Sequence, residues 1–230
     1  MTIRYSEFVT GASVRLDREA VVAASPRRKG LYRNGFKRIF DVTAVVLAAP
    51  VIVPLVLGLA LAVARDGGAP FYAQSRVGRG GRAFRMWKLR SMVSDADARM
   101  EGHLAANPEA RLEWDETQKL KDDPRITPLG RFLRKASIDE LPQLWNVLTG
   151  DMSLVGPRPM MLNQQEMYPG TAYYALRPGI TGYWQTAGRN RTTFEARAGY
   201  DTAYEAELSL TTDLKVLART IGVVVACTGF

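Results

Sequence analysis

The sequence predicts a mixed α/β fold, rich in helix, in which a re-entrant membrane helix hairpin joins a domain with a small sheet and interfacial amphipathic helices. Three observations predict this architecture. Residues 42–64 are 23 consecutive residues without a charge, which is enough to reach across a bilayer. Two short strand-like runs joined by a glycine-rich turn follow. The rest of the chain contains mainly polar and amphipathic helical patterns.

The chain divides into three predicted segments. Residues 1–29 mix small, polar and basic residues without sustained periodicity, which predicts a flexible basic leader, and they contain no signal-peptide pattern. Residues 30–68 are expected to form an interfacial helix followed by the re-entrant membrane helix. Residues 69–230 are expected to form a cytoplasmic domain that carries any chemistry.

The apolar segment has features that favour a hairpin over a single span. Residues 31–41 place apolar side chains on one helical face and basic ones on the other, as in a helix at a membrane surface. Pro50 and Pro54 each remove a backbone hydrogen-bond donor in the middle of the segment, so the helix is expected to bend there. Because basic residues flank both ends, both ends are predicted to be cytoplasmic. A single span and a buried helix of a soluble core are the alternatives.

The segments after the apolar run predict a hairpin and several helices. Residues 70–74 and 82–90 have strand-like composition and are joined by the glycine-rich residues 78–81. Helices are expected in three further segments, namely a solvated pair over residues 91–121 and single helices over residues 193–207 and 210–226.

Composition limits the possible chemistry. The chain has 230 residues, with 31 Lys and Arg against 23 Asp and Glu. Cys227 and His103 are its only cysteine and histidine, which excludes an internal disulfide and a zinc site built from several such ligands. An enzyme of this composition must use carboxylates, Lys, Arg or a hard metal ion. The basic excess leaves nucleic acid, an anionic membrane and phosphorylated substrates as partner classes.

Residues 121–160 pack acids, bases, prolines and glycines between short apolar runs, and we expect the functional site there. Ser137 to Glu140 fits a capping box, in which Ser137 caps a helix and Glu140 reaches back to its amide. The same helix end would lower the pKa of Asp139 and keep it ionised and nucleophilic. One carboxylate of the Asp139–Glu140 pair can then attack a phosphorus atom while the other holds Mg²⁺.

Basic side chains near this dyad are candidate phosphate ligands, because arginine binds phosphate through two parallel hydrogen bonds. Lys88 and Arg90 stand two residues apart and therefore on one face of a strand, and Arg158 lies in a rigid Gly-Pro-Arg-Pro turn. Ordinary surface charges are the alternative interpretation for all of these candidates, which are Lys88, Arg90, Arg134, Arg158, Arg189 and Arg191.

Five motifs match a known family: KRIFD before the apolar segment, QSRVG and WKLRSM after it, the stretch DDPRITPLGRFLRKASIDELPQLWNVLTGDMSLVGPRP, and RPGITGYWQTAGRN. From residue 37 to residue 230 the chain resembles the bacterial sugar transferases, also called monotopic phosphoglycosyl transferases or polyprenyl-phosphate sugar phosphotransferases. Many members break the membrane helix at a Ser-Pro pair, where this sequence has Val53-Pro54.

The resemblance implies transfer of sugar 1-phosphate from a UDP-sugar to undecaprenyl phosphate, with release of UMP. By the same resemblance Asp139 is the nucleophile that forms a covalent phosphosugar intermediate, Glu140 takes part in Mg²⁺ binding, and Arg158 contacts a phosphate. The family also implies a monotopic protein of the bacterial inner membrane, with the catalytic domain on the cytoplasmic face and membrane lipids as partners. A homo-oligomer is left open.

Within the family, the chain length and the KLKDDPRIT stretch are similar to the rhizobial enzymes that start exopolysaccharide synthesis. This similarity favours UDP-galactose or UDP-glucose as the donor. The alternative function is a non-catalytic membrane-surface scaffold of a polysaccharide assembly complex, with the dyad serving only as a helix cap. Nucleic-acid binding is disfavoured because much of the positive charge brackets the apolar segment.

Overall fold

The computed structural model describes residues 30–117, 120–188 and 193–225. The predicted leader, Arg189, Arg191 and Cys227 lie outside the described residues. The described part is rich in helix and holds two small sheets of two strands each. Its helices are α2 (Lys37–Val63), α3 (Ala96–Ala106), α4 (Pro108–Thr117), α5 (Pro128–Lys135), α6 (Gln143–Thr149), α7 (Ala172–Ala175), α8 (Arg197–Glu207) and α9 (Leu210–Val225).

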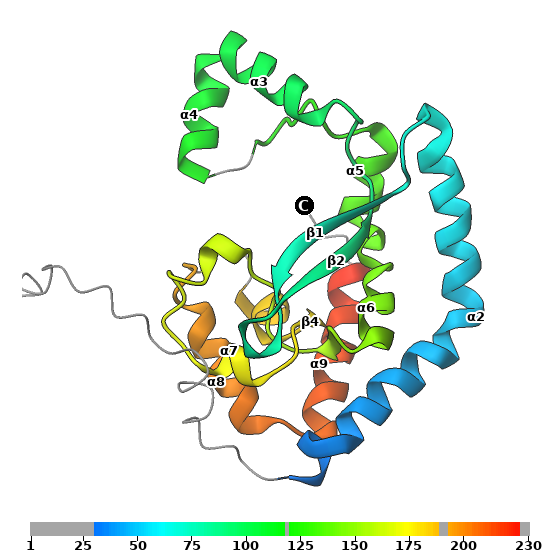
Figure 1. Ribbon diagram of the computed structural model, residues 1–230, viewed down its shortest axis with the longest axis vertical. Coiled ribbons are helices and arrows are strands. Elements are labelled where there is room, and N and C mark those ends of the chain that lie inside the picture. Colours follow the sequence, from blue (N-terminus) through cyan, green and yellow to red (C-terminus); the bar gives the residue numbers. More distant parts are fainter. Residues whose placement is uncertain (1–29, 118–119, 189–192, 226–230) are drawn as a thin grey trace, which may run out of the picture.

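The predicted β-hairpin after the apolar segment is confirmed. Strands β1 (Phe71–Val77) and β2 (Ala83–Leu89) pair antiparallel, with Phe71 opposite Leu89 and Val77 opposite Ala83. A second sheet pairs β3 (Ser153–Val155) with β4 (Gly179–Thr181) in parallel. In Figure 1 the long hairpin crosses the middle of the molecule, with α2 along one side and α7 and α8 on the other. The predicted helical pair is α3 and α4, which project from this body.

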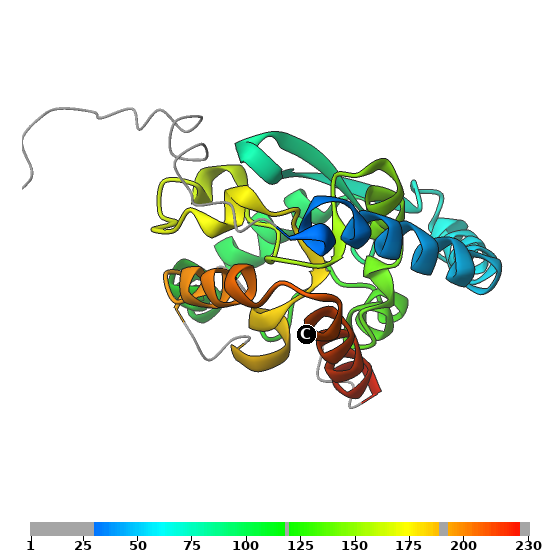
Figure 2. The same cartoon turned by 90° about the horizontal axis from the view of Figure 1, so that it is seen from below.

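Helix α2 is the one helix in the described part of the chain that is long and apolar enough to cross a membrane. It remains helical through Pro50 and Pro54, and its ribbon changes direction in the middle (Figure 1). Only Asp41, Val45, Ala60 and Val63 are buried, so the middle of the helix is exposed. Figure 2 shows much of α2 extending out from the body of the protein. This exposure argues against the buried helix of a soluble core.

The two buried ends of α2 contact the same domain. At the first end, the Arg38 guanidinium donates to the backbone carbonyls of Val147 and Leu148, and the Asp41 carboxylate accepts a hydrogen bond of 2.7 Å from the Ser153 hydroxyl. At the second end, Ala60 and Val63 pack in one apolar cluster with residues of β2 and α5. The domain therefore holds α2 at both ends and leaves its central apolar surface uncovered.

Glycine at position 130 lets α5 lie directly against the segment that follows β2. The hydroxyl of Thr127 caps this helix by accepting a hydrogen bond of 2.9 Å from the Gly130 amide. A Cβ atom at Gly130 would lie 1.9 Å from the carbonyl oxygen of Ser91, which is backbone and has little freedom to move. A side chain there must push α5 away from β2.

We predict that Gly130→Ala lowers the free energy of unfolding by about 1–3 kcal/mol, because the added methyl overpacks this contact. Gly102→Ala is the matched control, since a Cβ there meets nothing within 4 Å. Gly102 lies inside α3, where replacing glycine by alanine should raise the free energy of unfolding by about 0.5–1 kcal/mol. Thermal unfolding of the purified proteins in detergent measures both changes. Equal melting temperatures for Gly130→Ala and the native protein would contradict the close approach.

Candidate active site

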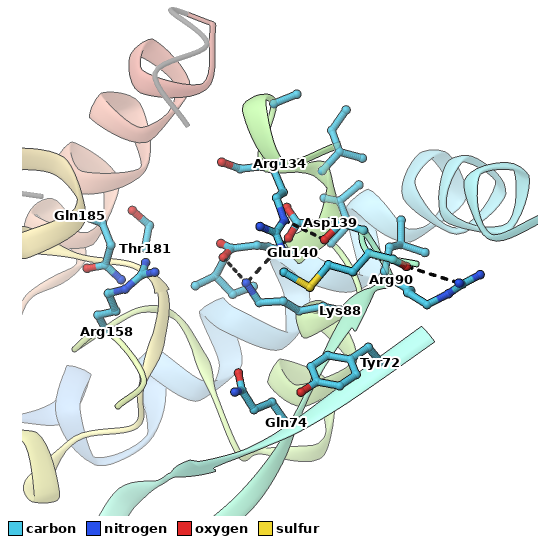
Figure 3. Close-up of a pocket in the computed structure, with 18 of the residues that line it drawn as sticks. Tyr72, Gln74, Lys88, Arg90, Arg134, Asp139, Glu140, Arg158, Thr181 and Gln185 are labelled. Atoms are coloured by element: carbon cyan, nitrogen blue, oxygen red, sulfur yellow. Dashed lines mark hydrogen bonds and ion pairs between the residues drawn. The ribbon is translucent and has the colours of Figure 1, made fainter. Parts of the chain in front are cut away.

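A pocket of about 970 Å³ lies between the β1–β2 hairpin and the C-terminal half of the domain. Its walls come from β1 and β2, from the single-turn helix Ile138–Glu140 that precedes α6, and from β4 and α9. Figure 3 shows Lys88, Asp139 and Glu140 together on one side of this pocket, with Arg158, Thr181 and Gln185 on the other. The predicted dyad and most of the predicted phosphate ligands are thus brought to one cavity.

Lys88 connects the two carboxylates of the dyad. Its Nζ atom lies 2.7 Å from Oε1 of Glu140 and 3.8 Å from Oδ2 of Asp139. Asp139 is only 7% exposed, while Lys88 and Glu140 are partly exposed. Because Lys88 comes from β2 and the dyad from the turn before α6, this cluster links the hairpin to the helical part of the domain.

The predicted capping box is wrong. Ser137 lies in the left-handed region at φ 55° and makes no side-chain capping hydrogen bond. Its carbonyl instead accepts a hydrogen bond from the Glu140 amide at 3.3 Å, which closes the single turn Ile138–Glu140. Helix α6 begins later, at Gln143, so Glu140 is not its third residue. The Glu140 side chain points instead to Lys88, across the pocket wall.

The predicted lowering of the Asp139 pKa by a helix terminus is also wrong. Asp139 precedes α6 by several residues and does not lie in its first turn. Burial raises the pKa of Asp139 above its ordinary value, and the charge of Glu140 adds to this effect. The positive charges of Lys88 and Arg134 oppose it. Lys88 therefore favours the ionised form in a setting that would otherwise favour the protonated acid.

The other predicted ligands divide into two groups. Arg134 and Arg158 line the pocket, and the Nε atom of Arg134 donates to the Ser91 hydroxyl at 2.8 Å. Arg90 also borders the pocket, but its guanidinium pairs with the Asp66 carboxylate and donates to the Val63 carbonyl at 3.1 Å. Arg90 therefore fastens the end of α2 to the hairpin.

Asn146 is a buried residue of the site that sequence reasoning missed. Its Oδ1 atom accepts from the Trp87 amide at 3.0 Å, and its Nδ2 atom donates to the Arg85 carbonyl at 2.8 Å. These two bonds fix the backbone of β2 against α6, directly beside Lys88. The only sequence signal was a single amide in the apolar run LWNVL, and a buried amide must find partners for both of its polar atoms.

The carboxylates fit a magnesium ion that is shared with a phosphate ligand. Within the described ranges no group of three or more His, Cys, Asp or Glu residues is arranged to hold a metal alone. Mg²⁺, however, is usually bound through one or two carboxylates together with substrate phosphates and water. Asp139 and Glu140 supply two adjacent carboxylates at the pocket wall, so the donor set is suitable for such an ion.

A sequence profile described as bacterial sugar transferase matches residues 32–227, and the chain belongs to this family. It is 48% identical over 190 residues to the UDP-galactose-lipid carrier transferase of Erwinia amylovora. It is 44% identical over 188 residues to the exopolysaccharide production protein ExoY of Rhizobium meliloti. It is also 39% identical over 196 residues to the UDP-glucose:undecaprenyl-phosphate glucose-1-phosphate transferase of Caulobacter vibrioides.

These relatives differ in how much of their own length the similarity covers. The matched region is 82% of this chain but only 40% of the Erwinia protein. It is 80% of this chain in the other two comparisons, and it covers 83% of the Rhizobium protein and 68% of the Caulobacter protein. The shared region contains α2, the hairpin and the dyad.

We predict that Lys88→Met raises the pKa of Asp139 further, because Lys88 is the largest of the effects that lower it. The measurement is a pH titration of the carboxyl resonance in protein labelled with ¹³C-aspartate. The resonance is assigned by its loss in Asp139→Asn. Arg82→Met removes the same charge from an exposed position near the hairpin turn and serves as the control. An Asp139 titration that is the same in Lys88→Met and Arg82→Met would refute the electrostatic role of Lys88.

Proposed function

We propose that this protein transfers sugar 1-phosphate from a UDP-sugar to undecaprenyl phosphate and releases UMP. The observation that carries this proposal is the buried Asp139 carboxylate beside Lys88 and Glu140 in a pocket lined by arginines. The names of the relatives support it, since they mention a lipid carrier, UDP-galactose, UDP-glucose and undecaprenyl phosphate.

The reaction proceeds in two displacements at one phosphorus atom. An Oδ atom of Asp139 attacks the phosphorus that bears the sugar, the bond from this phosphorus to the bridging oxygen breaks, and UMP leaves with the bond electrons. A phosphate oxygen of undecaprenyl phosphate then attacks the same phosphorus. The acyl-phosphate bond breaks and Asp139 returns as a carboxylate. A covalent intermediate lets a soluble donor and a membrane-held acceptor use the pocket in turn.

The surrounding residues have separate roles in this proposal. Lys88 favours the ionised form of Asp139, which is the form that acts as the nucleophile. Glu140 would hold the magnesium ion together with donor phosphate oxygens, and the ion supplies charge neutralisation on those oxygens. Arg134 and Arg158 would neutralise the remaining phosphate charge from fixed positions on the pocket wall.

We further propose that α2 is re-entrant, which makes the protein monotopic with its domain on the cytoplasmic face of the inner membrane. A straight helix of 27 residues would separate its ends by roughly 40 Å. Both ends of α2 nevertheless pack on one domain, and Pro50 and Pro54 lie between them. The basic flanks favour the cytoplasmic side for both ends. This arrangement would place the pocket beside the lipid head groups.

UDP-galactose or UDP-glucose is the donor we favour, and the product would be the first lipid-linked intermediate of an exopolysaccharide. The donor names of the Erwinia and Caulobacter relatives support this choice. The name of the Rhizobium relative supports the link to exopolysaccharide production.

We predict that purified protein releases UMP from one or both of these donors when undecaprenyl phosphate and Mg²⁺ are present. Asp139→Asn should reduce the rate by about 10³-fold or more, because the nucleophile is lost. Asp122→Asn, at an exposed acid, should leave the rate unchanged. Equal rates for Asp139→Asn and Asp122→Asn would refute the covalent role. Absence of release by folded native protein with every UDP-sugar would favour the scaffold function.

The membrane arrangement predicts that both ends of α2 are labelled from the same side. In a Cys227→Ser background, Asn34→Cys and Arg65→Cys place single thiols at exposed positions near either end of the helix. A membrane-impermeant maleimide should label both in inverted inner-membrane vesicles and neither in spheroplasts. Labelling of one position from each side would demonstrate a single span.

A further inference from the structure

Arg158 and Trp184 line the pocket, with Arg158 opposite the dyad, and two further arginines lie near Arg158. Arg158 follows β3 and lines the pocket together with Trp184, while Arg76 belongs to β1 and Arg197 begins α8. The Cζ atom of Arg197 lies 4.3 Å from the centre of the Trp184 ring, and that of Arg158 lies 5.4 Å from it. Figure 3 shows Arg158 across the cavity from Lys88 and Asp139.

The charges of this arginine cluster (Arg76, Arg158 and Arg197) are not balanced by ion pairs. Among the described residues, no carboxylate lies within ion-pair distance of any of the three guanidinium groups. Asp201 is the carboxylate whose charge acts on Arg197, and it already accepts a hydrogen bond of 2.7 Å from the Tyr168 hydroxyl. The cluster therefore holds an excess of positive charge beside the cavity.

Two of these arginines also have buried donors that lack a partner. The Nε atoms of Arg76 and Arg197 are buried and make no hydrogen bond within the described part of the chain. The one side-chain hydrogen bond that the structure shows for Arg76 runs from Nη2 to Oε1 of Gln74, at 2.5 Å. Buried N–H groups without an acceptor are rare in folded proteins and costly.

Burial and the charge of Arg158 lower the pKa values of Arg76 and Arg197. Burial lowers the pKa of Arg197 to about 10, and the charges of Arg158 and Arg76 add to this effect. Burial lowers the pKa of Arg76 as well, followed by the charge of Arg158. Arg76 and Arg197 are therefore partly desolvated cations beside the exposed Arg158, and a bound anion would relieve the repulsion among them.

We propose that Arg76, Arg158 and Arg197 form a phosphate-binding subsite for the nucleotide phosphate of the donor, with Arg158 in contact and the other two supplying charge behind it. This inference rests on the proposed function and adds Arg76 and Arg197 to its binding machinery. The donor would then span the pocket, with its sugar-bearing phosphate at Asp139 and its nucleotide phosphate at the arginine cluster. The charge of Glu140 acts on Arg76, so the two ends lie within electrostatic reach.

The position of the cluster favours the donor over the lipid acceptor as the source of this phosphate. Ile138, beside Asp139, packs on the apolar cluster that contains Ala60 and Val63 at the end of α2. The dyad therefore lies close to the second end of α2. Arg158 lies across the cavity from the dyad.

The test uses calorimetric titration of the purified full-length protein with two probes, UDP and uridine. We expect Arg197→Gln and Arg76→Gln to weaken UDP binding by about tenfold, since each removes a charge from the phosphate subsite. Uridine, which has no phosphate, should bind these variants as it binds the native protein. Arg82→Gln removes an exposed charge from the hairpin turn and should change neither affinity. Arg197→Lys should recover part of the loss because it restores the charge.

Four results would overturn the inference. Unchanged UDP affinity in Arg197→Gln and Arg76→Gln would refute the phosphate subsite without contradicting the proposed reaction. Equal losses for UDP and uridine would indicate that the arginines only support Trp184. A raised KM for undecaprenyl phosphate with unchanged UDP affinity would assign the subsite to the acceptor. Failure of the native protein to bind UDP would refute both the proposal of a UDP-sugar donor and this inference.

Discussion

Lys88 lies between two acids that are adjacent in sequence, and its charge makes a buried carboxylate compatible with its surroundings. Burial and the neighbouring Glu140 both favour the protonated form of Asp139, and Lys88 acts against them. The position of Lys88 depends in turn on β2, which the buried amide of Asn146 holds against α6. The chemistry proposed for Asp139 thus depends on a contact between two elements that are far apart in the chain.

The same strand connects the pocket to the apolar helix α2. Leu89 packs against Ala60 and Val63, and Arg90 donates to the Val63 carbonyl, so the residues after Lys88 hold the end of α2. The other end of α2 is held by β3 and α6. Between these two attachments α2 exposes large apolar side chains, among them Leu47, Val51 and Leu57. The position of α2 relative to the pocket is therefore set by direct packing at both of its ends.

Local patterns in the sequence predicted the β-hairpin, the long apolar helix and the C-terminal helices, because strand alternation, glycine turns and helical periodicity are properties of short segments. The motifs also predicted Asp139 and Glu140 as the functional dyad. The side-chain partner of Glu140 was predicted wrongly. The capping pattern at Ser137 is local in sequence, whereas the hydrogen bond that Lys88 donates to Glu140 joins residues far apart in the chain. Asn146 was missed for the same reason: its role depends on a strand some 60 positions earlier.

Covalent attachment of the sugar phosphate to Asp139 is the step on which the proposed function depends most. The most direct measurement is the intact mass of the protein after brief exposure to UDP-galactose or UDP-glucose and Mg²⁺ without lipid acceptor, followed by acid quenching and peptide mapping. We predict an added mass of one hexose phosphate on the peptide that contains Asp139, its loss when undecaprenyl phosphate is added, and its absence in Asp139→Asn. Protein that turns over both substrates but never carries this mass, or carries it on another residue, would contradict the account.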